Sequence, residues 1–164
     1  MAEFELRAYN TSYYAQVEEI FWLTSARTPE PSERESFKNK YLDDYLALLC
    51  FVALEKDKVL GYILCQQDPL LAPKSLEVFK DFTADYPAHL HINTHPQAQG
   101  KGVGAALLRK LEEQLQAQGV KGVHLVTHAE ARNRFFYEKN DYIPIHETAQ
   151  KLLMLGKKLR VKNL

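Results

Sequence analysis

The 164-residue sequence has no excess of charge of either sign. Lys and Arg together number 21, and so do Asp and Glu, which makes the formal net charge zero at pH 7. Proteins that bind nucleic acid usually carry a basic excess that neutralises phosphates. We therefore expect no nucleic-acid partner, while a local basic patch beside a bound phosphate stays compatible with this balance.

Cysteine and long apolar runs are also scarce. Cys50 and Cys65 each lie in a short apolar stretch typical of a strand, so we expect two buried free thiols and no disulfide framework. No stretch approaches the ~20 apolar residues of a membrane span. The N-terminal sequence MAEFELRAYN has acidic residues where a secretory signal needs basic ones. We expect a cytoplasmic protein without a membrane partner.

Hydrophobic periodicity predicts alternating strands and helices in a single domain over residues 1–164. Strands are predicted at 4–9, 48–54, 59–65, 88–94, 123–127, 141–145 and 151–159. Two helices follow the first strand, and the second ends at about Leu42. A third helix carries Val103, Leu107, Leu111 and Leu115 before Gly119 ends it, and a fourth covers 130–139. Segment 68–87 is interpreted as an insertion or lid.

Two connections predict the topology. The charged residues 55–58 join two apolar strands so closely that the pair forms an antiparallel hairpin. The stretch 88–127 is a strand–loop–helix–strand unit, whose crossover makes its strands parallel. We expect an α/β (α+β) fold with a mixed, mostly antiparallel sheet of six or seven strands and helices on both faces.

The loop between the strand 88–94 and the third helix contains three alternate glycines, in the sequence Gln99-Gly100-Lys101-Gly102-Val103-Gly104. Glycine allows the backbone to approach a ligand closely, and the free N–H groups of a helix start attract an anion. The Walker pattern GxxxxGK[ST] is absent, and the spacing differs from the G-x-G-x-x-G of a Rossmann loop. The pattern Q/R-x-x-G-x-G/A fits directly.

This loop resembles the acetyl-CoA signature of the GNAT superfamily of N-acetyltransferases, and the order of elements resembles the GNAT fold along nearly the whole chain. The resemblance implies that acetyl-CoA, as co-substrate, lies with its pyrophosphate on backbone N–H groups of the loop. The residues so implied are Gln99, Gly100, Lys101, Gly102, Val103, Gly104 and Ala105. It also implies that Ile92, Asn93 and Thr94 follow the pantetheine arm and help to polarise the thioester carbonyl.

A second stretch, Phe136-Tyr137-Glu138-Lys139, resembles the end of the later GNAT helix. Asp141 stands where the family usually has glycine, and Asp tolerates the left-handed conformation better than most residues. Amine attack on a thioester expels a thiolate, and a phenol close to that sulfur can protonate it. Tyr137 is the candidate general acid, and Asn133, one turn earlier, is a candidate ligand of the cofactor. The alternative makes Tyr137 a core aromatic residue, although Phe135 and Phe136 are expected to serve the core.

The general base is ambiguous. The family often uses a carboxylate on or near the strand before the glycine-rich loop, and this strand carries histidine and asparagine instead. Histidine has a suitable unperturbed pKa. His91 is the first candidate and His89 the second, with His124 and His128 as further alternatives. The histidines also raise the question of a zinc site, but a third ligand is not evident, so no metal is expected.

The resemblance implies an N-acetyltransferase that transfers an acetyl group to a small-molecule amine or peptide acceptor. The chain also resembles the acetyltransferase-like domain of some O-GlcNAc hydrolases, on the residues Gly61-Tyr62, Asp68-Pro69 and Tyr86-Pro87. With the missing strand carboxylate, this keeps open a catalytically silent acetyl-CoA-binding domain. Dimerisation is common in the family, which leaves a homodimer open. An acceptor pocket is expected near the first helices, where aromatic residues accompany Glu18 and Glu19.

Overall fold

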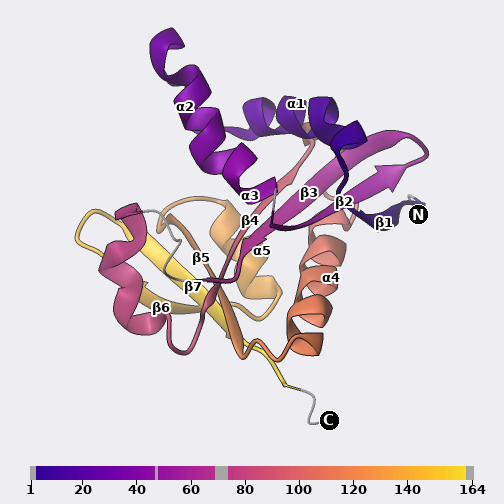
Figure 1. Ribbon diagram of the computed structural model, residues 1–164. Coiled ribbons are helices and arrows are strands. Elements are labelled where there is room, and N and C mark those ends of the chain that lie inside the picture. Colours follow the sequence, from indigo (N-terminus) through magenta and orange to yellow (C-terminus); the bar gives the residue numbers. More distant parts are fainter. Residues whose placement is uncertain (1–2, 47, 69–73, 162–164) are drawn as a thin grey trace. The chain divides into compact units, whose positions relative to one another are not determined.

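The fold is a mixed seven-stranded sheet flanked by helices, with the strand order β1-β2-β3-β4-β5-β7-β6 (Figure 1). The computed structural model describes residues 3–46, 48–68 and 74–161. β1 to β3 pair antiparallel, β4 and β5 pair parallel, and β7 pairs antiparallel with both β5 and β6. The predicted fold class is confirmed, including the hairpin and the parallel crossover.

The elements follow the predicted order. The strands are β1 (Glu5–Ala8), β2 (Leu49–Glu55), β3 (Lys58–Gln66), β4 (Ala88–Thr94), β5 (Gly122–His128), β6 (Ile143–Glu147) and β7 (Leu152–Lys158). The helices are α1 (Tyr14–Thr24), α2 (Arg34–Lys38), α3 (Asp44–Leu46), α4 (Val103–Ala117) and α5 (Asn133–Lys139).

Two helices differ from the prediction. A π-helical turn, Asn39–Asp43, joins α2 directly to α3, so one helical stretch runs to Leu46. Helix α5 begins at Asn133, later than the predicted residue 130. The reason is a turn in which the Ala131 N–H donates to the His128 carbonyl at 2.9 Å and the Glu130 N–H donates to His128 Nδ1 at 3.3 Å. The Arg134 N–H then donates to the Ala131 carbonyl at 3.2 Å, three residues earlier, so this stretch forms turns and lacks the i→i−4 pattern of an α-helix.

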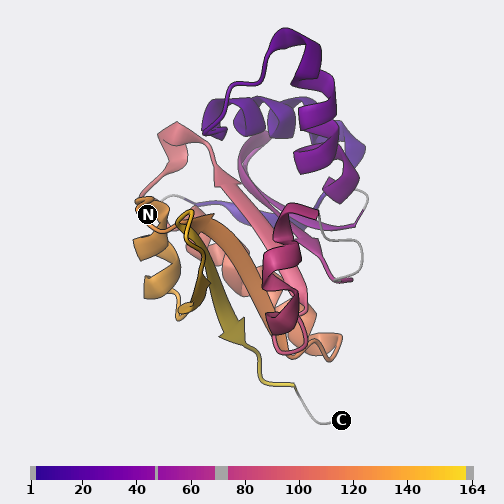
Figure 2. The same cartoon turned by 90° about the vertical axis from the view of Figure 1, so that its left-hand side faces the viewer.

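The chain divides into two compact units, and the first contains residues 1–65 and 91–111. Alternate residues of β2 and β3, among them Val52, Tyr62 and Leu64, join a buried cluster with residues of α1 to α3 (Figure 2). The opposite strand face meets α4, since a Cβ on Gly61 would lie 3.2 Å from Val103 and 3.3 Å from Leu107. Helices therefore cover both faces of the strands in this unit.

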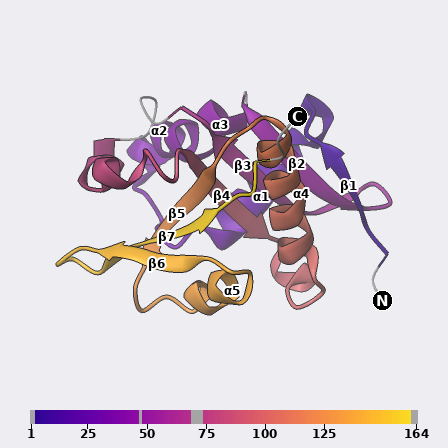
Figure 3. The same cartoon turned by 90° about the horizontal axis from the view of Figure 1, so that it is seen from below.

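The second unit contains residues 66–90 and 112–164, with β5, β6, β7 and α5 (Figure 3). Phe79, Tyr86 and Met154 form a buried cluster in it, against which Leu76 and Phe82 pack. Within segment 68–87, Lys74–Phe82 forms a 3₁₀ helix. Residues Pro69 and Pro73 lie outside the described residues, and the lid remains a prediction.

A polar network fixes the turn between α5 and β6 in the second unit. Glu112 accepts hydrogen bonds from the Tyr142 hydroxyl at 3.1 Å and from Lys157 Nζ at 2.9 Å. Lys157 also donates to the Asn140 carbonyl at 3.0 Å. Within this turn Asp141 has a φ of 69°, the left-handed conformation expected for it. The departure from the usual glycine is therefore accommodated.

Strand β6 ends the strand order, and its pairing with β7 is irregular. The register shifts between Pro144 and His146, so the two strands do not form an unbroken ladder. Leu155 pairs with Pro144, and Met154 pairs with His146.

Both cysteines are buried free thiols, as expected. Burial raises the pKa of each thiol to about 12, so Cys50 and Cys65 stay protonated at neutral pH. Among the residues that the structure describes, no helix has the length and apolar character needed to cross a membrane.

Gly122 is required by backbone packing in the second unit. A Cβ at this position would overlap the Asp85 carbonyl oxygen and lie 3.1 Å from Tyr86 Cα. We expect Gly122→Ala to lower the free energy of unfolding by about 3 kcal/mol, since rigid backbone has to move. Urea denaturation measures this change.

Gly119→Ala is the matched control for this substitution. Gly119 has a φ of 75° and open space where a Cβ would lie, so its replacement adds only backbone strain, about 1–2 kcal/mol. Equal losses for the two variants would contradict the steric explanation.

Candidate active site

The glycine-rich loop leads from β4 into α4 within the first unit. The His95 N–H donates to the Leu60 carbonyl at 2.8 Å, and His95 Nδ1 accepts from the Gln97 N–H at 3.1 Å. These bonds fix a 3₁₀ turn, Pro96–Ala98, before the glycines. The start of the loop is therefore tied to β3 by hydrogen bonds.

Two of the three glycines have backbone conformations that favour glycine. Gly100 has a φ of 76° and Gly102 a φ of 81°, both in the left-handed region. A Cβ on either residue would meet nothing within 4 Å, so the space beside the loop is open. Gly100 and Gly102 thus allow the backbone to adopt this turn and leave room for a ligand beside the loop.

Helix α4 begins directly after this turn and presents free amides to the loop. The Ala106 N–H donates to the Gly102 carbonyl at 3.1 Å, whereas Val103, Gly104 and Ala105 precede this i→i−4 bonding. The N–H groups of a helix start and the helix dipole both favour an anion. Gln99 and Lys101 are exposed beside them. The residues present fit a phosphate or pyrophosphate group.

The end of β4 carries the other residues predicted to meet a cofactor. Ile92, Asn93 and Thr94 are half-buried. The Asn93 side-chain amide donates to the Tyr62 hydroxyl at 2.8 Å. A Cβ on Gly61 would lie 3.0 Å from the Asn93 carbonyl oxygen, so β3 approaches this backbone closely. The sequence interpretation missed this support by Gly61 and Tyr62, and only the Gly-Tyr pair in a strand pattern pointed toward it.

His91 lies on β4 in the same unit as the loop and is half-buried. Its ring makes an edge contact with the Tyr45 ring from α3, with centroids 4.9 Å apart and an interplanar angle of 88°. The first unit therefore brings together the glycine-rich loop, the end of β4 and His91.

Tyr137 lies on α5 in the second unit and is 6% exposed. Its ring contacts Phe136 and Tyr142, with centroid distances of 5.2 and 6.1 Å. Burial raises the pKa of Tyr137 well above its usual value, so the phenol carries its proton at neutral pH. This protonation state is the one that a general acid needs.

The residues around Tyr137 correct one prediction. Phe135 was expected in the core and is 65% exposed. Two residues along a helix turn by about 200°, which places Phe135 on the face opposite to the buried Tyr137. Asn133, at the start of α5, is exposed, and its Oδ1 accepts from the Thr127 hydroxyl at 2.8 Å.

The other candidate bases have different surroundings in the second unit. His89 and His124 are paired across β4 and β5, are 3% and 2% exposed, and stack with centroids 4.9 Å apart. His124 Nδ1 lies 2.6 Å from the Tyr86 carbonyl oxygen and donates to it. His128 is exposed. Within the described part of the chain, no group of three or more His, Cys, Asp or Glu residues is arranged to hold a metal ion.

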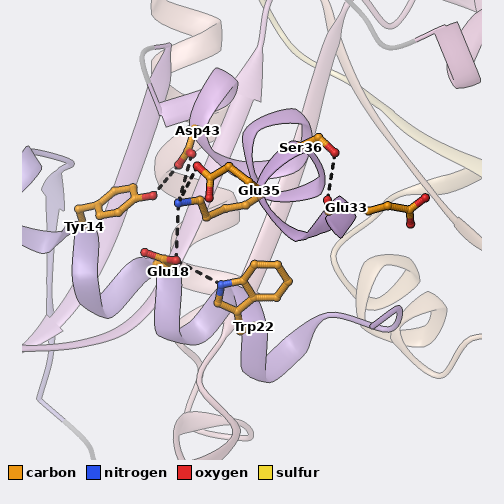
Figure 4. A network of polar contacts seen from close by, with 8 residues as sticks. Tyr14, Glu18, Trp22, Glu33, Glu35, Ser36 and Asp43 are labelled. Atoms are coloured by element: carbon orange, nitrogen blue, oxygen red, sulfur yellow. Dashed lines mark hydrogen bonds and ion pairs between the residues drawn. The ribbon is translucent and has the colours of Figure 1, made fainter. Parts of the chain in front are cut away.

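The two acidic residues predicted to line an acceptor pocket differ: one is bound to neighbouring side chains and the other is exposed to solvent. Glu18 accepts from Trp22 Nε1 at 3.3 Å and lies 3.7 Å from Lys38 Nζ (Figure 4). Glu19 is exposed. The carboxylate of Glu18 is therefore already partly neutralised within the first unit.

Comparisons with known proteins agree with this description. The family model described as the acetyltransferase (GNAT) family matches residues 15–142. The structure named SsHAT has a TM-score of 0.78 and 23% identity, over 95% of this chain and 98% of that chain. The ribosomal-protein-S18-alanine N-acetyltransferase from Escherichia coli has a TM-score of 0.67 and 18% identity, over 99% of both chains.

A third similar structure was solved with a ligand. The PaiA N-acetyltransferase from Thermoplasma acidophilum, in complex with coenzyme A, has a TM-score of 0.70 and 17% identity. The match covers 95% of this chain and 99% of that chain. These likenesses concern the fold.

The buried His124 predicts a loss of stability in acid. Burial lowers its pKa from 6.5, against the opposing effect of hydrogen bonds with the backbone of Tyr86 and Ala88. Below pH 6.5, His124 of the unfolded chain therefore binds a proton more readily than His124 of the folded chain. The stabilisation that is present above pH 6.5 is lost as the pH falls toward the pKa of His124 in the folded protein. We expect the free energy of unfolding to fall between about pH 7 and about pH 5.

Urea denaturation across this range measures the effect. His124→Gln should flatten the pH dependence, while His128→Gln, at an exposed position, should leave it unchanged. An unchanged slope in His124→Gln would refute the assignment.

Proposed function

The chain belongs to the GNAT acetyltransferase family, and we propose that it transfers an acetyl group from acetyl-CoA to an amine acceptor. The observation that carries this proposal is the loop in which Gly100 and Gly102 have left-handed backbone conformations and α4 begins directly after Gly102. Such an arrangement offers several amides to one anion. The acceptor in this proposal is a small-molecule amine or the amine of a peptide. The proposal applies equally to a monomer and to a homodimer.

The proposed cofactor site uses the loop residues for the pyrophosphate of acetyl-CoA. The N–H groups from Gln99 to Ala105 are the proposed donors, and the exposed Lys101 adds a positive charge beside them. The backbone of Ile92, Asn93 and Thr94 is proposed to follow the pantetheine arm. The close approach of Gly61 to the Asn93 carbonyl supports a fixed course for this backbone.

The proposed reaction is direct attack of the amine on the thioester. A C–N bond forms, the tetrahedral oxyanion collapses, and the C–S bond breaks as the thiolate leaves. Tyr137 is proposed to protonate that thiolate, since its phenol carries a proton at neutral pH. Asn133 is proposed as a further ligand of the cofactor.

His91 is the proposed general base that accepts the proton of the amine. It is half-buried and belongs to the unit that carries the glycine-rich loop. His89 and His124 suit this role less well, because each is almost fully buried and they stack on one another. A neutral imidazole has a pKa suitable for proton transfer near neutral pH.

The loop assignment predicts that Gly102→Ala weakens acetyl-CoA binding. A side chain disfavours a φ of 81° by about 1–2 kcal/mol, and relief of this strain would misalign the amides. We expect the Kd to rise about tenfold by calorimetry. Gly119→Ala adds the same strain at the other end of α4 and should leave the Kd unchanged. Absence of acetyl-CoA binding by the wild type would reject the assignment of the loop.

The acid assignment predicts that Tyr137→Phe lowers kcat about 100-fold and leaves the Kd for acetyl-CoA unchanged. Thiol release measures kcat over a panel of small amines and peptides. Tyr142→Phe removes the hydroxyl of another buried tyrosine, one that binds Glu112, and should retain turnover. Acetyl-CoA binding without turnover on any acceptor would favour a catalytically silent binding domain.

A further inference from the structure

The helical stretch that carries Tyr45 contains a π-helical turn, which brings the charged side chains of Lys38 and Asp43 to the same side of the helix. In an α-helix, residues five apart are rotated by about 140° from one another. In the turn Asn39–Asp43, the Asp44 N–H donates to the Asn39 carbonyl, five residues earlier. One such turn lets Lys38 Nζ come within 3.7 Å of Asp43 Oδ2.

The Lys38 ammonium joins this turn to α1. It lies 3.7 Å from Glu18 and 3.5 Å from Glu35, and its side chain is only 13% exposed. Asp43 also accepts a hydrogen bond from the Tyr14 hydroxyl at 2.8 Å (Figure 4). A hydrogen bond with Tyr14 and the charges of Asp43 and Glu18 raise the pKa of Lys38, which therefore stays protonated. Both ends of the turn are thus held against one helix.

Two residues, one within the turn and one after it, are buried, and the position of the second depends on the register of the turn. Leu42 is 0% and Tyr45 4% exposed, and both belong to the cluster beneath α1. Loss of the extra residue of a π-helical turn would rotate the following residues by about 100° relative to α2. That rotation would remove the Tyr45 ring from its edge contact with His91.

We propose that the π-helical turn, held by the Lys38–Asp43 ion pair, sets the Tyr45 ring against His91 and makes Tyr45 a positioning residue for the general base. This inference rests on the proposed function, in which His91 accepts the proton of the amine. Burial raises the pKa of Tyr45 to about 12, so the ring that meets the imidazole is neutral at neutral pH.

The second polar residue on this side of β4 is held in a comparable way. Asn93 lies two residues after His91 and is bound by the buried Tyr62 of β3. Side chains two apart on a strand share a face. His91 and Asn93 therefore each meet a tyrosine from a different element, Tyr45 of α3 for His91 and Tyr62 of β3 for Asn93.

Nuclear magnetic resonance on protein with isotope-labelled histidine tests the positioning directly. His91→Gln identifies the ring signals of His91. We expect a nuclear Overhauser effect between the Tyr45 and His91 rings in the wild type. Lys38→Met should abolish it and shift the His91 signals in the way that Tyr45→Leu does. Lys40→Met makes the same change at an exposed residue of the π-helical turn and should alter neither.

Two further variants keep the test decisive if Lys38→Met does not fold. Asp43→Asn removes the charge but retains an oxygen that accepts from Tyr14, and Lys38→Arg should restore the wild-type signals. Wild-type His91 signals and an intact Overhauser effect in folded Lys38→Met or Asp43→Asn would overturn the inference.

Kinetics separates failure of the inference from failure of the proposed function. On an amine accepted by the wild type, Tyr45→Leu should lower kcat about tenfold without changing the Kd for acetyl-CoA, and Tyr45→Phe should retain activity. Wild-type activity in His91→Gln would overturn the assignment of the base, whatever the resonance experiment gives. Wild-type kcat in folded Tyr45→Leu, with His91→Gln inactive, would overturn the role of Tyr45 alone.

Discussion

The left-handed backbone at Gly100 and Gly102 is the constraint on which the candidate site depends. It turns the chain from β4 into α4 within a few residues, so that the helix begins at Val103 with its amides toward the loop. Val103 and Leu107 are buried and pack over Gly61 of β3. The amides are therefore held in place by packing on one side of the loop, while the other side is open.

Local patterns in the sequence predicted the parts of the molecule that local interactions determine. Strand β4 has the predicted bounds, because its apolar residues alternate regularly over 88–94. The left-handed Asp141 also follows from a local preference. The family resemblance added the cofactor and the catalytic tyrosine, which remain predictions for this chain, as do the hydrolase-domain similarity and the single domain.

Contacts between distant residues could not be predicted in this way. The stacking of His89 on His124 depends on the register of β4 against β5, and the contact of Tyr45 with His91 depends on a π-helical turn. A one-residue insertion in a helix leaves little trace in a 3.6-residue period over so short a segment. Phe135 looked like a core residue because its type was considered without the orientation of α5.

The irregular pairing of β6 has a consequence for self-association. An edge strand exposes backbone donors and acceptors to which another chain can add a strand, and uncontrolled addition leads to aggregation. Pro144 has no N–H to donate, and the shift beside it interrupts the regular spacing of the remaining groups. The edge of β6 therefore offers a broken template for strand addition, which disfavours uncontrolled association of copies through this strand.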